Sequence, residues 1–223
     1  MASTARRPRW FAGSWRTGPD GIGSVVGAAM QRLCVFCGSA SGTRPSYAEA
    51  AAALGAALAR RGIGLVYGGG SIGLMGIIAD AVLRAGGSAI GVIPRGLYSA
   101  EIAHAGLTEL RVVSGMHDRK AVMASLADGF IALPGGLGTF EELLEMLTWP
   151  QLGIHRKPVA LLDVEGYWNG LRTLLDDAVA AGFVKPARAE LLLVDTDVEG
   201  LLDRIGSWTP PALPRIWLTP AEA

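Results

Sequence analysis

The stretch PGGLGT at residues 134–139 separates an apolar run from a segment of helical character. Glycine has no side chain, so a ligand can approach the backbone of such a stretch closely. Backbone amides at a helix N-terminus, together with the positive end of the helix dipole, favour a bound anion such as a phosphate. The stretch therefore predicts an anion site built from the main chain, a sharp structural turn, or both.

Thr139 and Glu142 have the spacing of a capping box, in which each side chain satisfies a backbone amide at the start of a helix. That interpretation gives Glu142 a purely structural role. A carboxylate one turn into this helix would also face whatever group the anion site holds. The residues alone leave both interpretations open.

A second group of candidate residues lies in MHDRK, at residues 116–120, where a helix is expected to begin after another apolar run. Arg119 can hold a phosphate or a carboxylate through two parallel hydrogen bonds. Lys120 fits a solvated helix face. No Gly-Lys-Ser/Thr follows the glycines of residues 134–139, which excludes a Walker A phosphate loop.

Two further glycine-rich stretches follow the first two apolar runs. Gly68, Gly70 and Gly73 match the dinucleotide pattern G-x-G-x-x-G. That pattern requires an acidic residue about 20 positions later and follows the first strand, and neither condition is met here. Binding of NAD or FAD is therefore disfavoured. A close strand–helix crossing or contact with a smaller nucleotide remains as an explanation of these glycines. The stretch at 38–42 fits a ligand loop and a tight turn equally well.

Cys34 and Cys37 form a C-x-x-C within an expected strand. Residues three apart in a strand point to opposite faces of the sheet, so the two thiols are not expected to act together. The histidines have no spacing typical of metal ligands, and we predict structural cysteines with neither a metal nor a cofactor. Reduced cysteines indicate a cytoplasmic protein.

The elements that must position these residues alternate between apolar runs and helical stretches. Near-continuous apolar strands are typical of a parallel sheet that helices cover on both faces. We therefore predict a single Rossmann-like, doubly wound α/β domain with a mostly parallel sheet of about seven strands. Helices are expected to begin near Pro45, Leu74, Met116, Phe140, Tyr167 and Val198. The expected strands are 33–37, 62–68, 88–94, 109–113, 129–134, 157–163 and 190–194.

The 223 residues carry no formal net charge, and half of them are apolar. This length allows one domain with an ample core, and the charge gives no electrostatic argument for nucleic acid or an anionic membrane. No apolar run reaches the roughly 18 residues of a membrane span. We predict a disordered leader at 1–29, with an ordered arm as the alternative, a catalytic domain at 30–206 and a Pro-rich arm at 207–223.

These motifs together resemble those of the LOG family, the cytokinin riboside 5′-monophosphate phosphoribohydrolases. The family signature PGGxGTxxE is complete at 134–142, and its companion Met-His-x-Arg-Lys is present at 116–120. The segments GGGSIGLMG and CVFCGS match as well. The resemblance covers residues 33 to 205 and does not extend to the first 30 residues or the Pro-rich tail.

The resemblance implies hydrolysis of the N-glycosidic bond of an N6-isoprenoid adenosine 5′-monophosphate, giving the free base and ribose 5-phosphate. It implies a homodimer with the active site near the subunit interface, and it places the catalytic pair on Arg119 and Glu142. The substrate contacts that it implies are Glu101, Arg119, Lys120, Gly136, Leu137, Gly138, Thr139, Phe140, Glu141, Glu142 and Thr148.

Three alternatives remain at the level of the sequence. An AMP nucleosidase would share every motif quoted above. A non-catalytic nucleotide-binding module would share the fold but would not need both Arg119 and Glu142. A lysine decarboxylase, a label often attached to this family, would need pyridoxal phosphate on a lysine. Only Lys120 lies near the expected site, so this alternative is disfavoured.

Overall fold

The computed structural model describes residues 30–98 and 103–211. The predictions for the leader at 1–29, for Glu101 and for most of the arm at 207–223 lie outside the described residues. The division of the chain into a leader, one domain and an arm therefore stays a prediction.

The sheet is parallel throughout its seven described strands, in the order β4-β3-β2-β1-β5-β6-β7. All seven predicted strands are confirmed, with small shifts at their ends. They are β1 (Arg32–Phe36), β2 (Gly64–Tyr67), β3 (Ala89–Pro94), β4 (Glu109–Val113), β5 (Gly129–Ala132), β6 (Val159–Leu162) and β7 (Leu192–Asp195).

Helices connect these strands, and three of them begin at the predicted residues, Pro45, Met116 and Val198. Proline suits the first turn of a helix because its fixed φ is already helical and its missing N–H has no partner to lose there. The short α6 was not predicted, since four residues are too few to show a helical period. The helices are α1 (Pro45–Arg60), α2 (Gly73–Arg84), α3 (Met116–Leu126), α4 (Leu137–Leu152), α5 (Asn169–Ala180), α6 (Pro186–Ala189) and α7 (Val198–Gly206).

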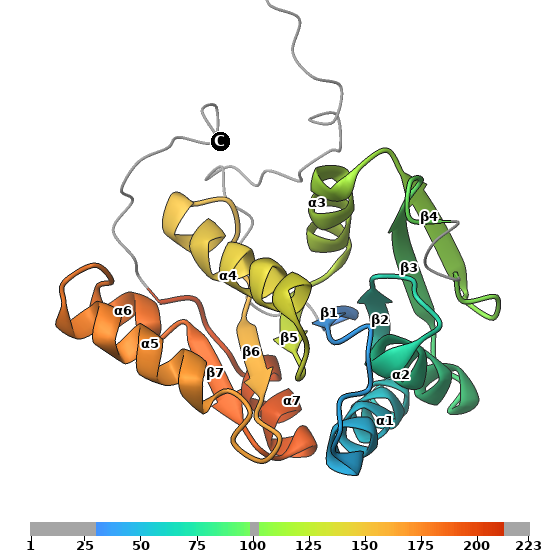
Figure 1. Cartoon of the computed structure of the whole chain (residues 1–223), viewed down its shortest axis with the longest axis horizontal. Helices are drawn as coiled ribbons and strands as arrows, with labels where there is room; N and C mark the ends of the chain where they lie inside the picture. Colours follow the sequence, from blue (N-terminus) through green and yellow to red (C-terminus); the bar gives the residue numbers. More distant parts are fainter. Residues whose placement is uncertain (1–29, 99–102, 212–223) are drawn as a thin grey trace, which may run out of the picture.

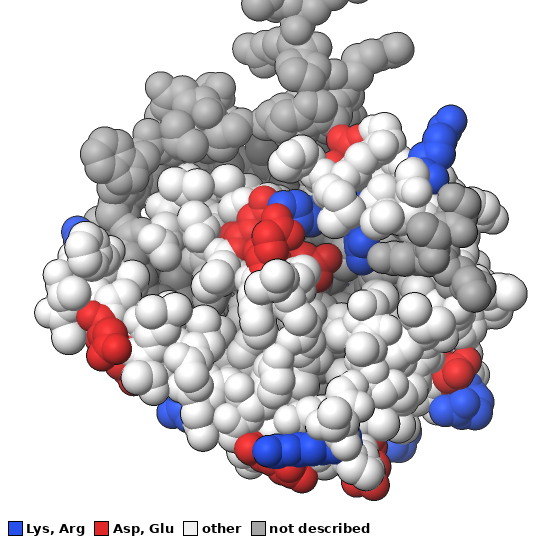
Figure 2. Space-filling model, viewed as in Figure 1, with Lys and Arg blue, Asp and Glu red and all other residues white. Residues whose placement is uncertain are grey.

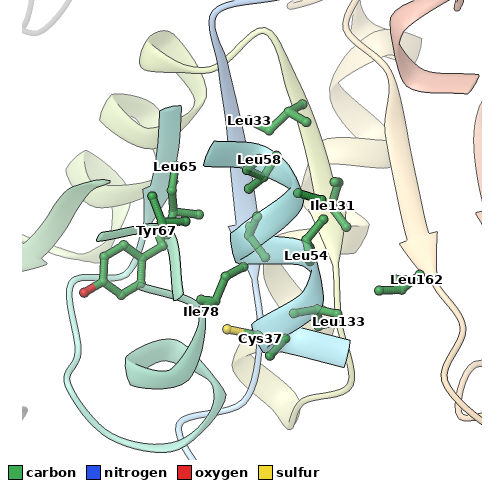
Figure 3. Close-up of a cluster of buried hydrophobic side chains, with 14 of the residues drawn as sticks. Leu33, Cys37, Leu54, Leu58, Leu65, Tyr67, Ile78, Ile131, Leu133 and Leu162 are labelled. Carbon is green, nitrogen blue, oxygen red and sulfur yellow. The ribbon is translucent and has the colours of Figure 1, made fainter. Parts of the chain in front are cut away.

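Two apolar clusters, one on each face of the sheet, form the core, and the helices cover both faces (Figure 1). On one face, α1, α2 and α7 pack against the strands, and Figure 3 shows Leu54 and Leu58 of α1 lying over Leu33, Leu65 and Ile131. On the other face, α3 and α4 contribute to the second cluster. This arrangement confirms the predicted doubly wound α/β fold.

Cys34 and Cys37 belong to different clusters, one on each face of the sheet, as the strand geometry predicts. Both are buried free thiols, and burial raises the pKa of each. Within the described residues, no group of His, Cys, Asp and Glu side chains could hold a metal ion. No described helix is long and apolar enough to cross a membrane.

The strand order reverses direction between β1 and β5. From β1 the chain moves outward through β2 and β3 to β4, then returns to place β5 on the other side of β1. In open α/β sheets, ligands bind at such a switch point, beyond the carboxyl ends of the strands. The loops after β1, β2 and β5 are therefore the place to look for a site.

Candidate active site

The loops after β1, β2 and β5 contact one another at the switch point. The amide of Gly38 donates to the carbonyl of Pro134 at 3.1 Å, and the amide of Leu74 donates to the carbonyl of Gly38 at 3.0 Å. The loop after β1 thus links the other two. Close approach requires glycine, since a Cβ at Gly135 would lie 2.8 Å from the Gly38 nitrogen.

The helix after β5 begins earlier than predicted. Its N-cap is Gly136, and no side chain caps it, so the predicted capping box of Thr139 and Glu142 is wrong. The amide of Phe140 already donates to the carbonyl of Gly136 at 3.1 Å. Thr139 lies within the first turn, and its hydroxyl occupies the space where a side chain of Gly135 would be.

The N-terminus of α4 borders open space. A Cβ at Gly136 or at Gly138 would meet no atom within 4 Å. The first amides of a helix have no acceptor within the helix, and the dipole makes this end positive. The arrangement can bind an anionic group, which a larger residue at either position would obstruct.

Arg119 and Glu142, predicted as a pair, come together from α3 and α4. Nη2 of Arg119 lies 3.9 Å from Oε1 of Glu142, and both side chains are about nine-tenths buried. The distance permits an ion pair but exceeds a normal hydrogen bond. After burial itself, the charge of Glu142 is the next largest cause of the raised pKa of Cys34 and of Cys37, so this carboxylate lies close to β1.

Lys120 is not on a solvated face, which corrects the interpretation from sequence alone. It is 5% exposed and forms ion pairs with Glu141 and, at 3.1 Å, with Glu145. Burial lowers its pKa, but the hydrogen bonds to the two carboxylates outweigh that effect and raise it overall. Figure 2 shows acidic side chains gathered near the centre of this face, over α4, with basic side chains beside them. Lys120 therefore ties α3 to α4.

Other residues implied by the resemblance lie in different surroundings. Leu137 is 83% exposed at the start of α4, whereas Phe140 packs edge-on against Trp168. Thr148 is exposed and donates to the carbonyl of Leu144 at 2.7 Å. It follows Glu142 by about 9 Å along the helix axis, at 1.5 Å per residue. Glu101 lies outside the described residues, although Ala103 pairs with Gly70 of the loop after β2.

Tyr167 is a supporting residue that sequence reasoning missed. Its hydroxyl donates to the carbonyl of Gly135, and its ring lies edge-on to that of Trp168. The signal for it was available, because an aromatic pair follows β6 at the carboxyl edge of the sheet. Tyr167 fixes the start of the loop that leads into α4.

A hollow of about 410 Å³ lies at the same edge of the sheet, beside the ends of β6 and β7. Its polar lining includes the acidic residues Glu49, Asp163, Glu165 and Asp197, and no described Lys or Arg lines it. An anion would be repelled there. The switch point suits an anionic ligand better than this hollow, because a cation, a carboxylate and an open helix N-terminus lie together there.

Comparisons with known proteins identify close relatives. Residues 75–205 match the family model described as "Possible lysine decarboxylase". The chain is 52% identical over 181 residues to the cytokinin riboside 5′-monophosphate phosphoribohydrolase LOG7 of Arabidopsis thaliana, covering 81% of this chain and 83% of that protein. It is 51% identical to the probable phosphoribohydrolase LOGL3 of Oryza sativa subsp. japonica, covering 81% and 86%.

Solved structures resemble the fold at much lower identity. The molybdenum cofactor carrier protein of Chlamydomonas reinhardtii has a TM-score of 0.61 and 24% identity, covering 78% of this chain and 95% of that one. The molybdenum cofactor binding protein of Rippkaea orientalis has a TM-score of 0.60 and 22% identity, covering 79% and 96%. At this identity the likeness concerns the fold alone.

Proposed function

The chain belongs to the LOG family of cytokinin riboside 5′-monophosphate phosphoribohydrolases, and we propose that Arg119 and Glu142 carry this activity in it. The reaction hydrolyses the N-glycosidic bond of a cytokinin nucleotide and releases the free base and ribose 5-phosphate. The observation that carries the assignment is the buried Arg119–Glu142 pair beside the open N-terminus of α4.

The 5′-phosphate is assigned to the start of α4, from its N-cap Gly136 to Thr139. Its support is the open space beside Gly136 and Gly138, which leaves the amides of the first turn accessible to an anion. Because the phosphate is remote from the bond that breaks, its binding serves to position the ribose.

Breaking the glycosidic bond builds positive charge on the ribose, in an oxocarbenium-like transition state. Water adds to C1′ as the bond to the base breaks, and the electron pair leaves with the base, which takes up a proton. Glu142 stabilises the developing charge and accepts a proton from the water. Arg119 offsets the charge of the buried carboxylate and orients it, together with the substrate.

The remaining substrate contacts are proposed with different support. Leu137 and Glu141 flank the amides of the first turn, while Phe140 packs into the core. Lys120 forms ion pairs with two carboxylates of α4. We therefore propose that it acts on the substrate indirectly, by holding α4 in position. Contacts from Glu101 and Thr148 stay predictions.

Lysine decarboxylation, which the description of the family model suggests, does not fit the lysines present. Lys120 is paired with two carboxylates that raise its pKa, whereas a lysine that forms a Schiff base must lose its proton. Nζ of Lys157 donates to the carbonyls of Ala124 and Ala127, at the end of α3 remote from the switch point. Lys185 is exposed, beyond α5.

We also propose a homodimer in the cytoplasm. Exposed Met116, Leu137 and Leu144 place apolar surface on α3 and α4 beside the site, where a second subunit would cover it. The two buried free thiols suit a reducing compartment. Light scattering after gel filtration tests the dimer, and a monomer mass over the whole concentration range would contradict it.

The decisive experiment measures release of free base by chromatography from AMP and from N6-isopentenyl-AMP. Wild type should release base from the isopentenyl nucleotide in preference, and Glu142→Gln should lower turnover by on the order of a thousandfold. Any fall in melting temperature would report the broken pair with Arg119 and not a lost cap, because Glu142 does not cap α4. Release from AMP alone would identify an AMP nucleosidase. Binding of both nucleotides without release would identify a non-catalytic module.

A further inference from the structure

The glycines after β2 match no dinucleotide site, and the reaction described above gives them no part. We propose that Gly68 is a positioning residue, which holds the guanidinium of Arg119 in place by leaving empty the volume that this group occupies. The inference rests on the proposed function, since it assigns Gly68 an effect on the reaction through Arg119.

The contact between Gly68 and Arg119 is the basis of this proposal. A Cβ at Gly68 would lie 2.0 Å from Nη2 of Arg119, 3.2 Å from its Cζ and 3.1 Å from Sδ of Met75. Non-bonded heavy atoms normally approach to about 3.5–4.0 Å. The guanidinium therefore occupies the volume that any larger residue at position 68 would fill.

Packing, rather than hydrogen bonding, accounts for the position of this side chain. Arg119 is 6% exposed, and its Nε has no hydrogen-bond partner among the described residues. Its Nη2 is 3.9 Å from Glu142, beyond hydrogen-bond distance. A long side chain held so weakly by polar contacts depends on the shape of its surroundings, which Gly68 and the buried Met75 supply.

Backbone conformation does not explain the glycine at position 68. Gly69 and Gly73 have positive φ, but Gly68 does not, so alanine could adopt its backbone conformation. The clash would involve the end of a flexible side chain, which can move away. At Gly76, by contrast, a Cβ would lie 2.1 Å from the backbone oxygen of Ser71. Alanine at position 68 should therefore displace the guanidinium and leave the fold intact.

The test compares Gly68→Ala with Gly70→Ala, a control in the same loop whose Cβ would have the flexible side chain of Met75, and not Arg119, as its nearest neighbour. Gly68→Ala should lower kcat for base release by on the order of a hundredfold, the effect of displacing a catalytic group by about 1 Å. The effect on KM should be smaller, with a melting temperature close to that of wild type. Gly70→Ala should keep most of its turnover.

A double-mutant cycle shows whether Gly68 acts through Arg119. If it does, Gly68→Ala should cause no further loss in the Arg119→Ala background. The same cycle is measured on the dissociation constant of ribose 5-phosphate, which requires no turnover. Equal losses in both backgrounds, or a melting temperature that falls together with kcat, would overturn the proposal.

The cycle also separates this inference from the proposed function. If Arg119→Ala turns over as fast as wild type, Arg119 has no catalytic role. Gly68 then cannot affect the reaction through Arg119 either. Loss of turnover in Arg119→Ala, combined with wild-type turnover in Gly68→Ala, would leave the proposed function standing and overturn the positioning role alone.

Discussion

The loop after β2 and the loop after β5 lie at the same edge of the sheet and are both rich in glycine, but the space beside their glycines is used differently. From the end of β2 into the first turn of α2, protein atoms fill that space: Arg119 beside Gly68, the Ser39 backbone beside Gly73, and the Ser71 backbone beside Gly76. After β5, the space beside Gly135 is also filled, by Thr139 and the backbone of Gly38, but Gly136 and Gly138 border open space. A glycine motif indicates close approach, and its neighbours decide whether protein or ligand makes that approach.

The largest expected effect concerns the filled loop. Gly73 has φ +61°, and a Cβ there would lie 2.3 Å from the carbonyl carbon and oxygen of Ser39. Gly73→Ala should therefore lower the free energy of unfolding by about 4 kcal/mol, from backbone strain and overpacking together. Urea denaturation measures it.

Gly86→Ala is the matched control for this substitution. Gly86 has φ +78° with nothing within 4 Å of its Cβ position, so alanine there causes strain without a clash. The same loss in both variants would show that packing against Ser39 is not what requires glycine at position 73.

The open loop has no protein atoms beside Gly136 and Gly138, so its position depends on how α4 is held. Lys120 is the main candidate, and Lys120→Met should lower the free energy of unfolding by about 2 kcal/mol. The loss is smaller than for a fully buried pair because Glu141 is half exposed. Lys185→Met, at an exposed lysine, is the control and should change stability little.

The pH dependence of stability gives a second readout of Lys120. Its folded-state pKa is raised above the ordinary 10.5, so its contribution is fully present below pH 10.5 and is lost as the pH rises through the folded-state value. Lys120→Met should lack this alkaline loss. If Lys120→Met loses stability at alkaline pH just as wild type does, that loss of stability comes from another titrating group.

The smallest effect on stability is expected at Gly138, the second residue of α4. Gly138→Ala should stabilise the unliganded protein by about 0.5–1 kcal/mol, because alanine favours a helix. It should also raise KM for the nucleotide about tenfold, through a weakened phosphate contact.

Gly170→Ala is the control at the second residue of α5, where a Cβ also meets nothing within 4 Å. It should show the gain in stability without the change in KM. If the KM of Gly138→Ala equals that of wild type, the proposal that the phosphate binds at the start of α4 is contradicted.

Much of the architecture could be predicted because it follows from patterns of neighbouring residues. The continuous apolar runs indicated every strand of the parallel sheet, and the C-x-x-C in β1 predicted thiols on opposite faces. The start of α4 was misplaced because Thr139 and Glu142 have capping-box spacing, whereas the loop geometry begins the helix at Leu137. Local spacing could not show that the hydroxyl of Thr139 packs against Gly135.

The site was predictable in part. The pairing of Arg119 with Glu142 was implied by the resemblance of two motifs to those of the LOG family, and the structure brings the two side chains together. The burial of Lys120 did not, because it depends on carboxylates from a helix more than 15 residues further along the chain. The contact between Gly68 and Arg119 likewise joins the loop after β2 to α3, and no pattern within either segment indicates it.

The pairing of β1 also affects the order in which the molecule can form during synthesis. Cys34 aligns with Val66 of β2 on one side and with Phe130 of β5 on the other. As the ribosome extends the chain, β1 can pair with β2 early, but its second edge stays open until β5 has emerged. Contacts between residues so distant in sequence form slowly. The switch point therefore lies at the last seam to close in the centre of the sheet. Glu142 follows β5 in the chain, so its pair with Arg119 can form only after β5 has emerged.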